Sequence, residues 1–307
     1  MLNISGLGKS IAAFVKTDQY NKEILYVDDN LDNKDKALKK NIDDDEINEL
    51  LQKRNKTRRA QEIYKIKNAI NKNIDLEDDE LNKIKNKLLE NNNQVIGKEI
   101  TLNNGFLQVI PPNETNKRQI LYVCGASGSG KSYFSAKYCK AYKQLYPDRN
   151  IYIFSKLDDD AVLDELDPIR IDIDTITDEN NIELENYRNS LIIFDDTDTI
   201  SDKAQRKAIN QIKSDVLELG RHFNISAIIT SHLITNYRES RTILNETHIL
   251  VVYPKSGSSY QINYALKNYC GVGKEDLQKI FKLESRWVAV FKNYPMCVVY
   301  EKGAYIL

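Results

Sequence analysis

The chain has 307 residues, which is enough to bury a large core in one large domain or two smaller ones. Its formal net charge is −1, so the molecule as a whole has no electrostatic attraction to nucleic acid, and any such attraction must come from a local patch. No apolar run approaches the roughly 20 residues that cross a bilayer. The 4 cysteines form no CxxC pair, which argues against a zinc site or a disulfide framework and favours a reducing compartment.

The N-terminal third differs in composition from the rest. The first residues, MLNISGLGKSIAAFVK, lack a long apolar core and a cleavage pattern, so no signal peptide is expected. Residues 34–95 are rich in Lys, Asp, Glu and Asn, and their sparse apolar residues recur at helical spacing. This pattern predicts two or three amphipathic helices. We therefore expect a charged, mainly helical extension over 1–97 and a second domain over 98–307.

The extension contains a dense basic run. Its members are Lys53, Arg54, Lys56, Arg58 and Arg59. Such side chains could contact DNA phosphates without reading sequence, but a solvated helix face is the more common explanation of a single charge run. Loops at the edge of a sheet, such as KSGSSY at 255–260, are an alternative DNA contact.

From residue 98 onward, strand and helix patterns alternate. The segment 98–110 has a strand pattern that Pro111-Pro112 ends. Further strands are expected at 119–124, 150–154, 169–173, 191–196, 226–231 and 247–253, with a C-terminal hairpin over 287–291 and 297–301. Helices are expected at 131–145, 202–220, 259–269 and 274–282. Apolar strands separated by helices predict an α/β fold, a mostly parallel sheet with both faces covered.

The stretch GASGSGKS fits the phosphate-loop pattern G-x-x-x-x-G-K-[ST] in full. Its residues are Gly125, Ala126, Ser127, Gly128, Ser129, Gly130, Lys131 and Ser132. The stretch follows an apolar strand and opens a helix, where glycines let backbone N–H groups approach an anion and the helix N-terminus adds partial positive charge. The pattern predicts ATP binding, with Lys131 on the β- and γ-phosphates and the Ser132 hydroxyl on Mg²⁺.

A second group of candidates ends the apolar strand LIIFDD. Asp195 and Asp196 follow four apolar residues at the strand's carboxyl end, close to where the phosphates would lie. We expect Asp195 to hold Mg²⁺ through water and Asp196 to orient or deprotonate the attacking water. Aspartate is shorter than the glutamate that many hydrolytic P-loop enzymes have here, so whether Asp196 or another group is the base stays open.

A third group ends the strand SAIITSH at 226–232. Thr230, Ser231 and His232 could contact the γ-phosphate or the attacking water, or simply cap the strand. We favour His232 over Ser231 as the side chain that senses the γ-phosphate.

An arginine stands just before that strand. Gly220 is expected to end the long helix, which leaves Arg221 at an edge that could face a neighbouring subunit's nucleotide. An arginine that neutralises transition-state charge in trans contributes about 10³–10⁵ in rate. Arg238 and Arg241 are alternative candidates, and a surface arginine that suits the helix dipole explains Arg221 as well.

Together, GASGSGKS, LIIFDDTD and GRHFNISAIITSH resemble the FtsK–HerA group of ring-forming P-loop motors, and more closely the poxvirus-type genome-packaging ATPases of nucleo-cytoplasmic large DNA viruses. The resemblance covers about 118–260 and leaves out 1–97. It implies a RecA/FtsK-like P-loop NTPase fold, ATP with Mg²⁺, and a homo-oligomeric ring, hexamer or pentamer. It also implies sequence-independent translocation of double-stranded DNA into a capsid, capsid or portal partners, and a place in the host cytoplasm (viral factory) or the virion.

Three alternatives stay open. Zonula-occludens-toxin-like phage assembly ATPases share the same core. A nucleotide kinase would share the phosphate loop but should carry an arginine-rich lid, and no such cluster follows residue 131. A nucleotide-gated scaffold would use 34–95 to recruit partners. In FtsK–HerA motors a glutamine commonly ends the strand that corresponds to SAIITSH, where this chain has Ser231 and His232. Which side chain senses the γ-phosphate therefore also stays open.

Overall fold

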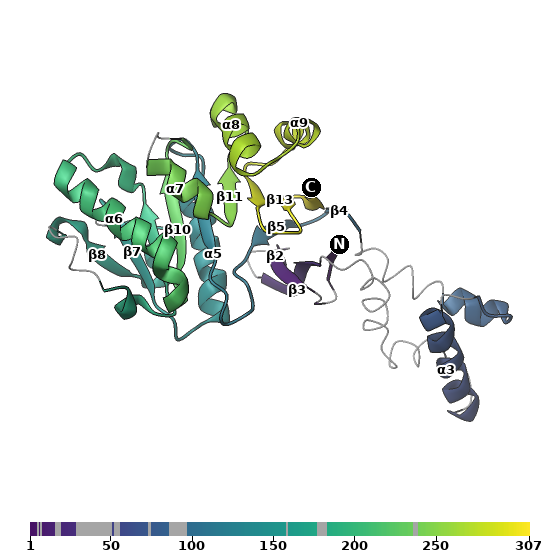
Figure 1. The fold of residues 1–307 in the computed structure, drawn as a ribbon. Coiled ribbons are helices and arrows are strands. Elements are labelled where there is room, and N and C mark those ends of the chain that lie inside the picture. Colours follow the sequence, from purple (N-terminus) through teal and green to yellow (C-terminus); the bar gives the residue numbers. More distant parts are fainter. Residues whose placement is uncertain are drawn as a thin grey trace.

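A computed structural model describes residues 1–4, 6, 8–15, 20–28, 51, 56–72, 75–85, 97–157, 159–176, 183–235 and 239–307. Its main feature is a ten-stranded sheet in the order β4-β14-β13-β12-β11-β6-β10-β9-β7-β8 (Figure 1). The parallel part consists of β6 (Ile120–Cys124), β7 (Ile151–Ser155), β8 (Ile169–Asp172), β9 (Leu191–Asp195), β10 (Ser226–Ser231) and β11 (Ile249–Val252). All six strands were expected from the sequence, and the α/β fold class is confirmed.

The antiparallel part extends the expected C-terminal hairpin. It consists of β12 (Val288–Phe291), β13 (Cys297–Tyr300), β14 (Gly303–Ile306) and β4 (Glu99–Thr101). The sequence pattern predicted β12 and β13 but not β14, which returns after a tight turn. Gly303 is required there, because a Cβ on it would lie 2.2 Å from the carbonyl oxygen of Ile100 on the neighbouring strand.

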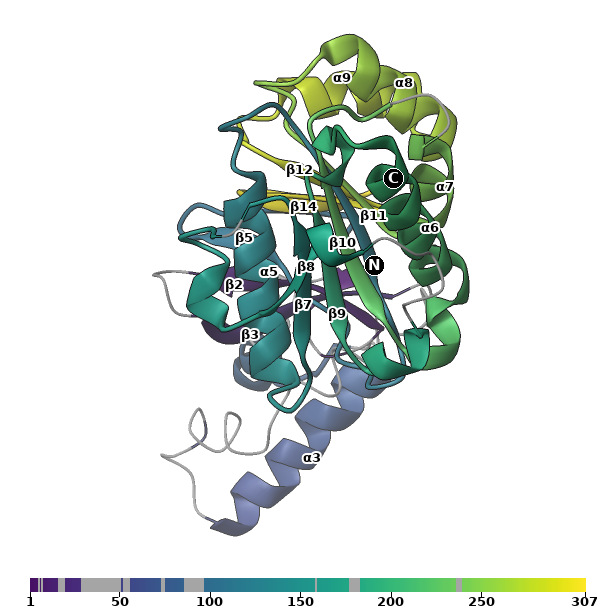
Figure 2. The ribbon, with the colours of Figure 1, turned by 90° about the vertical axis from the view of Figure 1, so that its left-hand side faces the viewer.

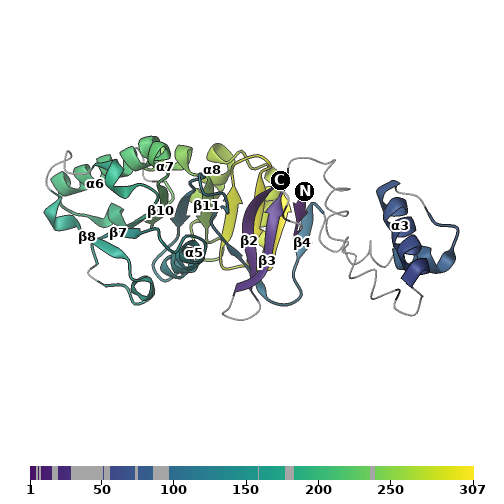
Figure 3. The same ribbon diagram turned by 90° about the horizontal axis from the view of Figure 1, so that it is seen from below.

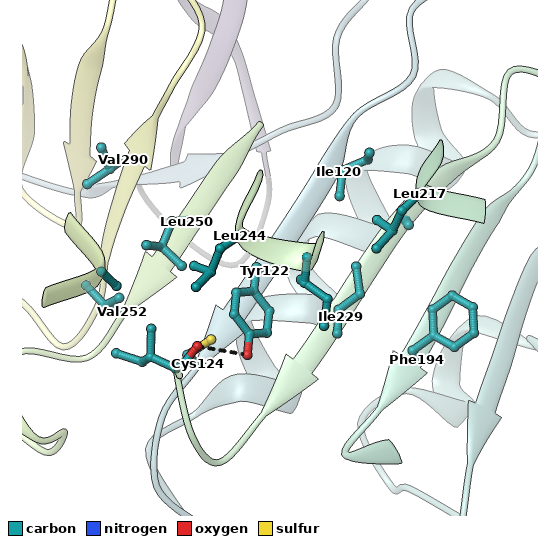
Figure 4. Close-up of a cluster of buried hydrophobic side chains, with 14 of the residues drawn as sticks. Ile120, Tyr122, Cys124, Phe194, Leu217, Ile229, Leu244, Leu250, Val252 and Val290 are labelled. Atoms are coloured by element: carbon teal, nitrogen blue, oxygen red, sulfur yellow. Dashed lines mark hydrogen bonds between the residues drawn. The ribbon is translucent and has the colours of Figure 1, made fainter. Parts of the chain in front are cut away.

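Two cores lie on the two faces of this sheet, since side chains alternate along each strand. One core contains Ile120, Tyr122 and Cys124 of β6 (Figure 4). The other contains Leu121 and Val123. The four residues of β11 and all five of β6 are buried, so these strands read as continuous apolar runs, as parallel strands covered on both sides do.

Helices cover the first core. They are α6 (Lys203–Leu219), α7 (Glu239–Glu246), α8 (Ser259–Tyr269) and α9 (Lys274–Lys282). On the opposite face lies α5 (Lys131–Leu145), as Figures 2 and 3 show. The predicted helices at 131–145, 202–220, 259–269 and 274–282 are confirmed within one residue at each end.

Beside α5, a second sheet covers the same face, and the sequence did not predict it. Its order is β1-β3-β2-β5, with β1 (Leu2–Asn3), β2 (Lys9–Val15), β3 (Tyr20–Val27) and β5 (Phe106–Val109). The residues before 28 were expected to belong to a mainly helical extension, and the described ones instead form strands. Burial along β2 is almost continuous, so it lacks the alternation that identifies a half-exposed strand.

The structure of residues 98–110 also differs from the single strand segment that was expected there. These residues form two short strands, β4 and β5, which belong to different sheets. The second sheet thus contains strands from both sides of the expected boundary at 97/98, because β2 pairs with β5.

The charged segment contains the helix α3 (Lys56–Lys72), which fits the predicted helical pattern. Ile66 of this helix packs with Leu51 and Leu81 in a small core of its own. In the basic run, Arg58 is paired with Glu62 at 2.9 Å. Residues 79–85, where another helix was expected, are helical as well. The helix expected before Leu51, with Lys53 and Arg54, lies outside the described residues. No helix in the described ranges has both the length and the apolar character to span a membrane.

Candidate nucleotide-binding site

The phosphate loop lies between β6 and α5. Two of its glycines are needed for their backbone conformation and the third for lack of space. Gly128 has a φ of 75° and Gly130 a φ of 105°, both in the left-handed region that favours glycine. Gly125 has an ordinary φ, but a Cβ on it would lie 2.5 Å from Ser129 Oγ and 2.7 Å from the Tyr253 ring. Ala126, Ser127 and Gly128 are exposed, whereas Gly125 and Lys131 are buried. The eight predicted residues therefore form a glycine cradle whose tip is open to solvent.

The start of α5 has the properties of an anion site. Gly130 is its N-cap and supplies no side-chain acceptor to the first turn, which contains no acidic residue. The N–H groups of that turn and the positive end of the helix dipole are available to phosphate oxygens. The half-buried Ser132 is in this turn.

Lys131 connects three elements. Its side chain is buried, and Nζ donates to the carbonyl oxygen of Gly125 at 3.1 Å. Nζ also lies 3.5 Å from Asp196 Oδ2 and 3.3 Å from His232 Nδ1. The structure thus brings together three residues that the sequence assigned to a phosphate site from three separate motifs.

The hydrogen bonds around His232 fix the position of its proton. Lys131 can only donate, so Nδ1 of His232 accepts. Nε2 then carries the hydrogen and donates to Asp196 Oδ2 at 3.0 Å. With this arrangement His232 hydrogen-bonds both neighbours and lies at the end of β10, between the phosphate-loop lysine and the second aspartate.

Asp195 and Asp196 differ in environment although they are adjacent. Asp195 is 5% exposed and accepts hydrogen bonds from Thr230 Oγ1 at 2.9 Å and Ser155 Oγ at 3.4 Å. Burial raises the pKa of Asp195, and the Thr230 hydroxyl opposes that rise. The side chain of Asp196 is 28% exposed, and its backbone is left-handed, with a φ of 42°. The turn at Asp196 directs its carboxylate towards Lys131 and His232.

Thr230 links the two aspartates through its hydroxyl group. Its Oγ1 accepts from the backbone N–H of Asp196 at 2.8 Å and lies 3.1 Å from Asp196 Oδ1 as well as 2.9 Å from Asp195 Oδ1. A hydroxyl has one proton, so it donates to one of the two carboxylates at a time. The sequence suggested a contact with phosphate or water for Thr230, and in the structure its partners are the aspartates.

Two further polar residues of the site were missed by sequence reasoning. Ser155 ends β7 directly opposite Asp195 in the strand register. Asp198 accepts a hydrogen bond from Ser231 Oγ at 2.7 Å, so Ser231 faces away from Lys131 and towards the turn after β9. The available signal was the end of each strand, since NIYIFS and LIIFDDTD both finish in polar residues.

A magnesium ion fits this site only together with phosphates. Within the described residues no group of three or more His, Cys, Asp or Glu side chains could hold a metal ion by itself. Mg²⁺ is commonly bound through one or two carboxylates plus substrate phosphates. Asp195 and Ser132 would supply the protein's share of such a coordination shell.

Arg221 lies at the opposite edge of the sheet. It is exposed in the 3₁₀ turn Gly220–Phe223, just before β10, whereas His232 follows the end of β10. This strand has 6 residues and spans about 20 Å. Arg221 is therefore remote from Lys131 of its own subunit. Arg241 is exposed on α7, and Arg238 lies outside the described residues.

Gly220 ends α6 as expected, since it is the C-cap residue of that helix. It does so without a left-handed backbone: its φ of −56° and ψ of −16° are right-handed, and the left-handed residue follows at Asn224, which has a φ of 54°. Gly220 is small for a different reason. A Cβ on it would lie 3.0 Å from Arg118 Nη1, which donates to the carbonyl oxygen of Val216 at the end of α6.

Comparisons with known proteins give one clear relative. No family model matches the chain. The uncharacterized protein V3 of Sputnik virophage is 41% identical over 189 residues, which cover 61% of this chain and 76% of that protein.

Solved structures with a similar fold include the genome packaging NTPase B204 from Sulfolobus turreted icosahedral virus 2 in complex with ATP-gammaS. It is 11% identical with a TM-score of 0.40, over 61% of this chain and 98% of that one. Another is the pCW3 conjugation coupling protein TcpA, which is 13% identical with a TM-score of 0.43, over 67% and 66% of the two chains. A third is the cytoplasmic domain of the Thermomonospora curvata Type VII secretion ATPase EccC, which is 14% identical with a TM-score of 0.43, over 68% and 28%.

Proposed function

The chain belongs to the same family as protein V3 of Sputnik virophage, and from its site geometry we propose that it is an ATP-hydrolysing motor that moves double-stranded DNA into a viral capsid. The observation that supports this most is the meeting of Lys131, Asp196 and His232, which come from three different motifs. The motor unit would be residues 98–307, joined by the strands before residue 28.

ATP and Mg²⁺ would bind in the glycine cradle. When bound, the metal ion would neutralise charge on the phosphates, held by Asp195 and Ser132. Lys131 would transfer its contact from Asp196 to the β- and γ-phosphates, because a polyanion competes strongly for an ammonium group. Asp196 would then retain its contact with His232 and be available to orient the attacking water.

Completion of the site would require a second copy. Arg221 cannot reach the phosphates of its own subunit, so its proposed action is in trans, across the interface of a homo-oligomeric ring. A hexamer or pentamer would place one arginine beside each nucleotide. Capsid or portal components would then be partners, in the host cytoplasm or the virion.

A nucleotide kinase is less well supported. Phosphoryl transfer to a small acceptor calls for cationic side chains that close over the phosphates. In the described part of the site, the side chains near Lys131 are Asp196 and His232, and Arg170 is paired instead with Asp164 at 2.6 Å.

The test is steady-state ATPase activity with and without duplex DNA, combined with light scattering for the mass of the assembly. We expect free phosphate release, stimulation by DNA, and a mass of several subunits with nucleotide present. A protein that remains monomeric with ATP and DNA, and whose turnover is unaffected by DNA, would contradict the translocase.

Asp196→Asn distinguishes a motor from a scaffold. The amide keeps the shape and can still contact His232, but it cannot accept a proton from water. We expect ATP binding to persist and turnover to fall by about 10²–10⁴, the usual contribution of general acid–base catalysis. If the protein were a nucleotide-gated scaffold, the variant would bind its partner as the unaltered protein does. The unaltered protein would then show no DNA-dependent turnover.

A further inference from the structure

The end of the molecule formed by α8 and α9 contains a cleft with an unusual charge. The cleft has a volume of about 640 Å³ and lies between the two helices, which project from the edge of the sheet beyond β11 (Figure 1). Lys267, Lys274 and Lys282 line it, and no acidic side chain does. Buried Leu277 and half-buried Phe281 form part of its floor.

The lysines of the cleft differ from other lysines nearby. Lys279 is paired with Glu99 at 2.9 Å, and Lys255 donates to the carbonyl oxygen of Phe281. Among the described residues, no carboxylate pairs with the three lysines of the cleft. Their charges are therefore not neutralised within the described part of the chain, and the stretch 255–286 has six basic and three acidic residues in a chain of net charge −1.

The exposed face of α8 continues this surface. Tyr260 is 78% exposed and Tyr264 is 45% exposed. Together with Lys267 they recur at the spacing of one helix face, so the two hydroxyls and the ammonium group form a row. Asn263 on the same helix also lines the cleft. The hydroxyls, the amide and the ammonium group can all donate hydrogen bonds to phosphate oxygens.

The surface is directly linked to the phosphate loop. Strands β6 and β11 are parallel neighbours, so their carboxyl ends lie at the same edge of the sheet. The ring of Tyr253, which follows β11, lies where a Cβ on Gly125 would clash. The carbonyl oxygen of Tyr253 accepts from Ser256 and Gly257 in the turn that leads into α8. Tyr253 therefore contacts both the phosphate loop and the turn that leads into α8.

We propose that the α8–α9 cleft and the exposed face of α8 bind the phosphate backbone of double-stranded DNA. The inference rests on the proposed function and names the surface through which the motor holds its cargo. Duplex DNA carries one negative charge per about 1.7 Å, so the three unneutralised lysines of the cleft complement it. A protein with no net positive charge needs such a local patch to bind DNA.

The experiment replaces Lys267, Lys274 and Lys282 together by alanine in the full chain. All three side chains are exposed, so the fold should persist. We expect basal ATPase activity to be unchanged, DNA stimulation to be lost, and affinity for a random-sequence duplex to fall at least tenfold. The slope of log affinity against log salt should decrease by about 2–3, because each phosphate contact contributes about 0.9.

A matched control removes three other exposed lysines, Lys98 before β4, Lys140 of α5 and Lys203 of α6, and should leave the salt slope and the stimulation unchanged. If the unaltered protein is stimulated by DNA and the cleft variant is stimulated equally, the cleft is not the DNA surface and the translocase still stands. If the unaltered protein binds no duplex DNA, both proposals are overturned. If the cleft variant no longer binds a poly-glutamate peptide but still binds DNA as the unaltered protein does, the cleft binds an acidic protein partner. That result would overturn this inference.

Discussion

The two edges of the large sheet both carry cationic side chains, but these side chains have different partners. At the carboxyl edge, Lys131 contacts the side chains of Asp196 and His232. At the amino edge, Arg118 donates to the carbonyl oxygens of Val216 and Leu217 at 2.8 and 2.7 Å, at the end of α6.

The partners show which cationic side chains hold the fold together and which are available to a ligand. Arg118 is of the first kind and Lys131 of the second. Carbonyl groups at a helix end lack intrahelical partners, and a guanidinium there satisfies them permanently. Burial lowers the pKa of both Arg118 and Lys292 at this edge. Burial also lowers the pKa of His248 to about 4, so this histidine is neutral and accepts a hydrogen bond from the N–H of Ile120. At the carboxyl edge the lysine has side-chain partners that phosphates can replace.

The largest expected effect comes from Lys131→Ala. The change removes the only side chain that joins the phosphate loop to Asp196 among the described contacts. We expect ATP binding to fall below detection in calorimetry and turnover to be lost. Lys143→Ala on the same helix is the control, since its Nζ contacts only main-chain oxygens near Pro147 in the described structure. Undiminished ATP binding by Lys131→Ala would mean that the cradle is not the nucleotide site.

Arg221→Ala tests whether the amino edge also contributes to catalysis. If Arg221 acts in trans, turnover should fall by about 10³ or more while ATP binding by the isolated subunit is unchanged. Mixing this variant with Asp196→Asn should restore part of the activity, because some interfaces would then combine an intact arginine with an intact aspartate. Arg241→Ala, on α7, should have little effect. Equal losses in the two arginine variants would leave the assignment to Arg221 unsupported.

The smallest expected effect is on the pH dependence of the free energy of unfolding. Burial raises the pKa of Asp195 above its value in the unfolded chain, so the folded state holds the proton more tightly. The free energy of unfolding should therefore decrease as pH rises from about 4 through the raised pKa, because the ionised carboxylate is disfavoured in the fold. Asp195→Asn removes that loss and should stabilise the protein at pH 7 by about 0.5–1 kcal/mol, and the gain should disappear near pH 4.

Urea unfolding curves between pH 4 and 7 measure this effect. Asp148→Asn, which removes the same charge from an exposed position, is the matched control. A variant at Asp195 that is less stable than the parent at pH 7 would show that the ionised carboxylate stabilises the fold through its hydrogen bonds with Thr230 and Ser155.

The sequence alone determined the phosphate loop and the ends of the strands around it. The loop is a local pattern, and each strand of the parallel sheet is a short apolar run, so residue type and spacing were enough to identify Lys131, Asp195, Asp196 and His232 as candidates that would lie together. The helices α5, α6, α8 and α9 were predictable for the same reason, since their amphipathic period is a property of consecutive residues, whereas the shorter α7 was not predicted.

Only the tertiary structure decided which residues meet across the strands. Ser155 faces Asp195 because β7 pairs with β9, and Thr230 reaches both aspartates because β10 lies between β9 and β6. The second sheet depends on β2 pairing with β5, almost a hundred residues later in the chain. Strand order is set by contacts between residues far apart in sequence, and no local pattern encodes it. For the same reason, only the fold could place Arg221 at the edge opposite to its own phosphate loop.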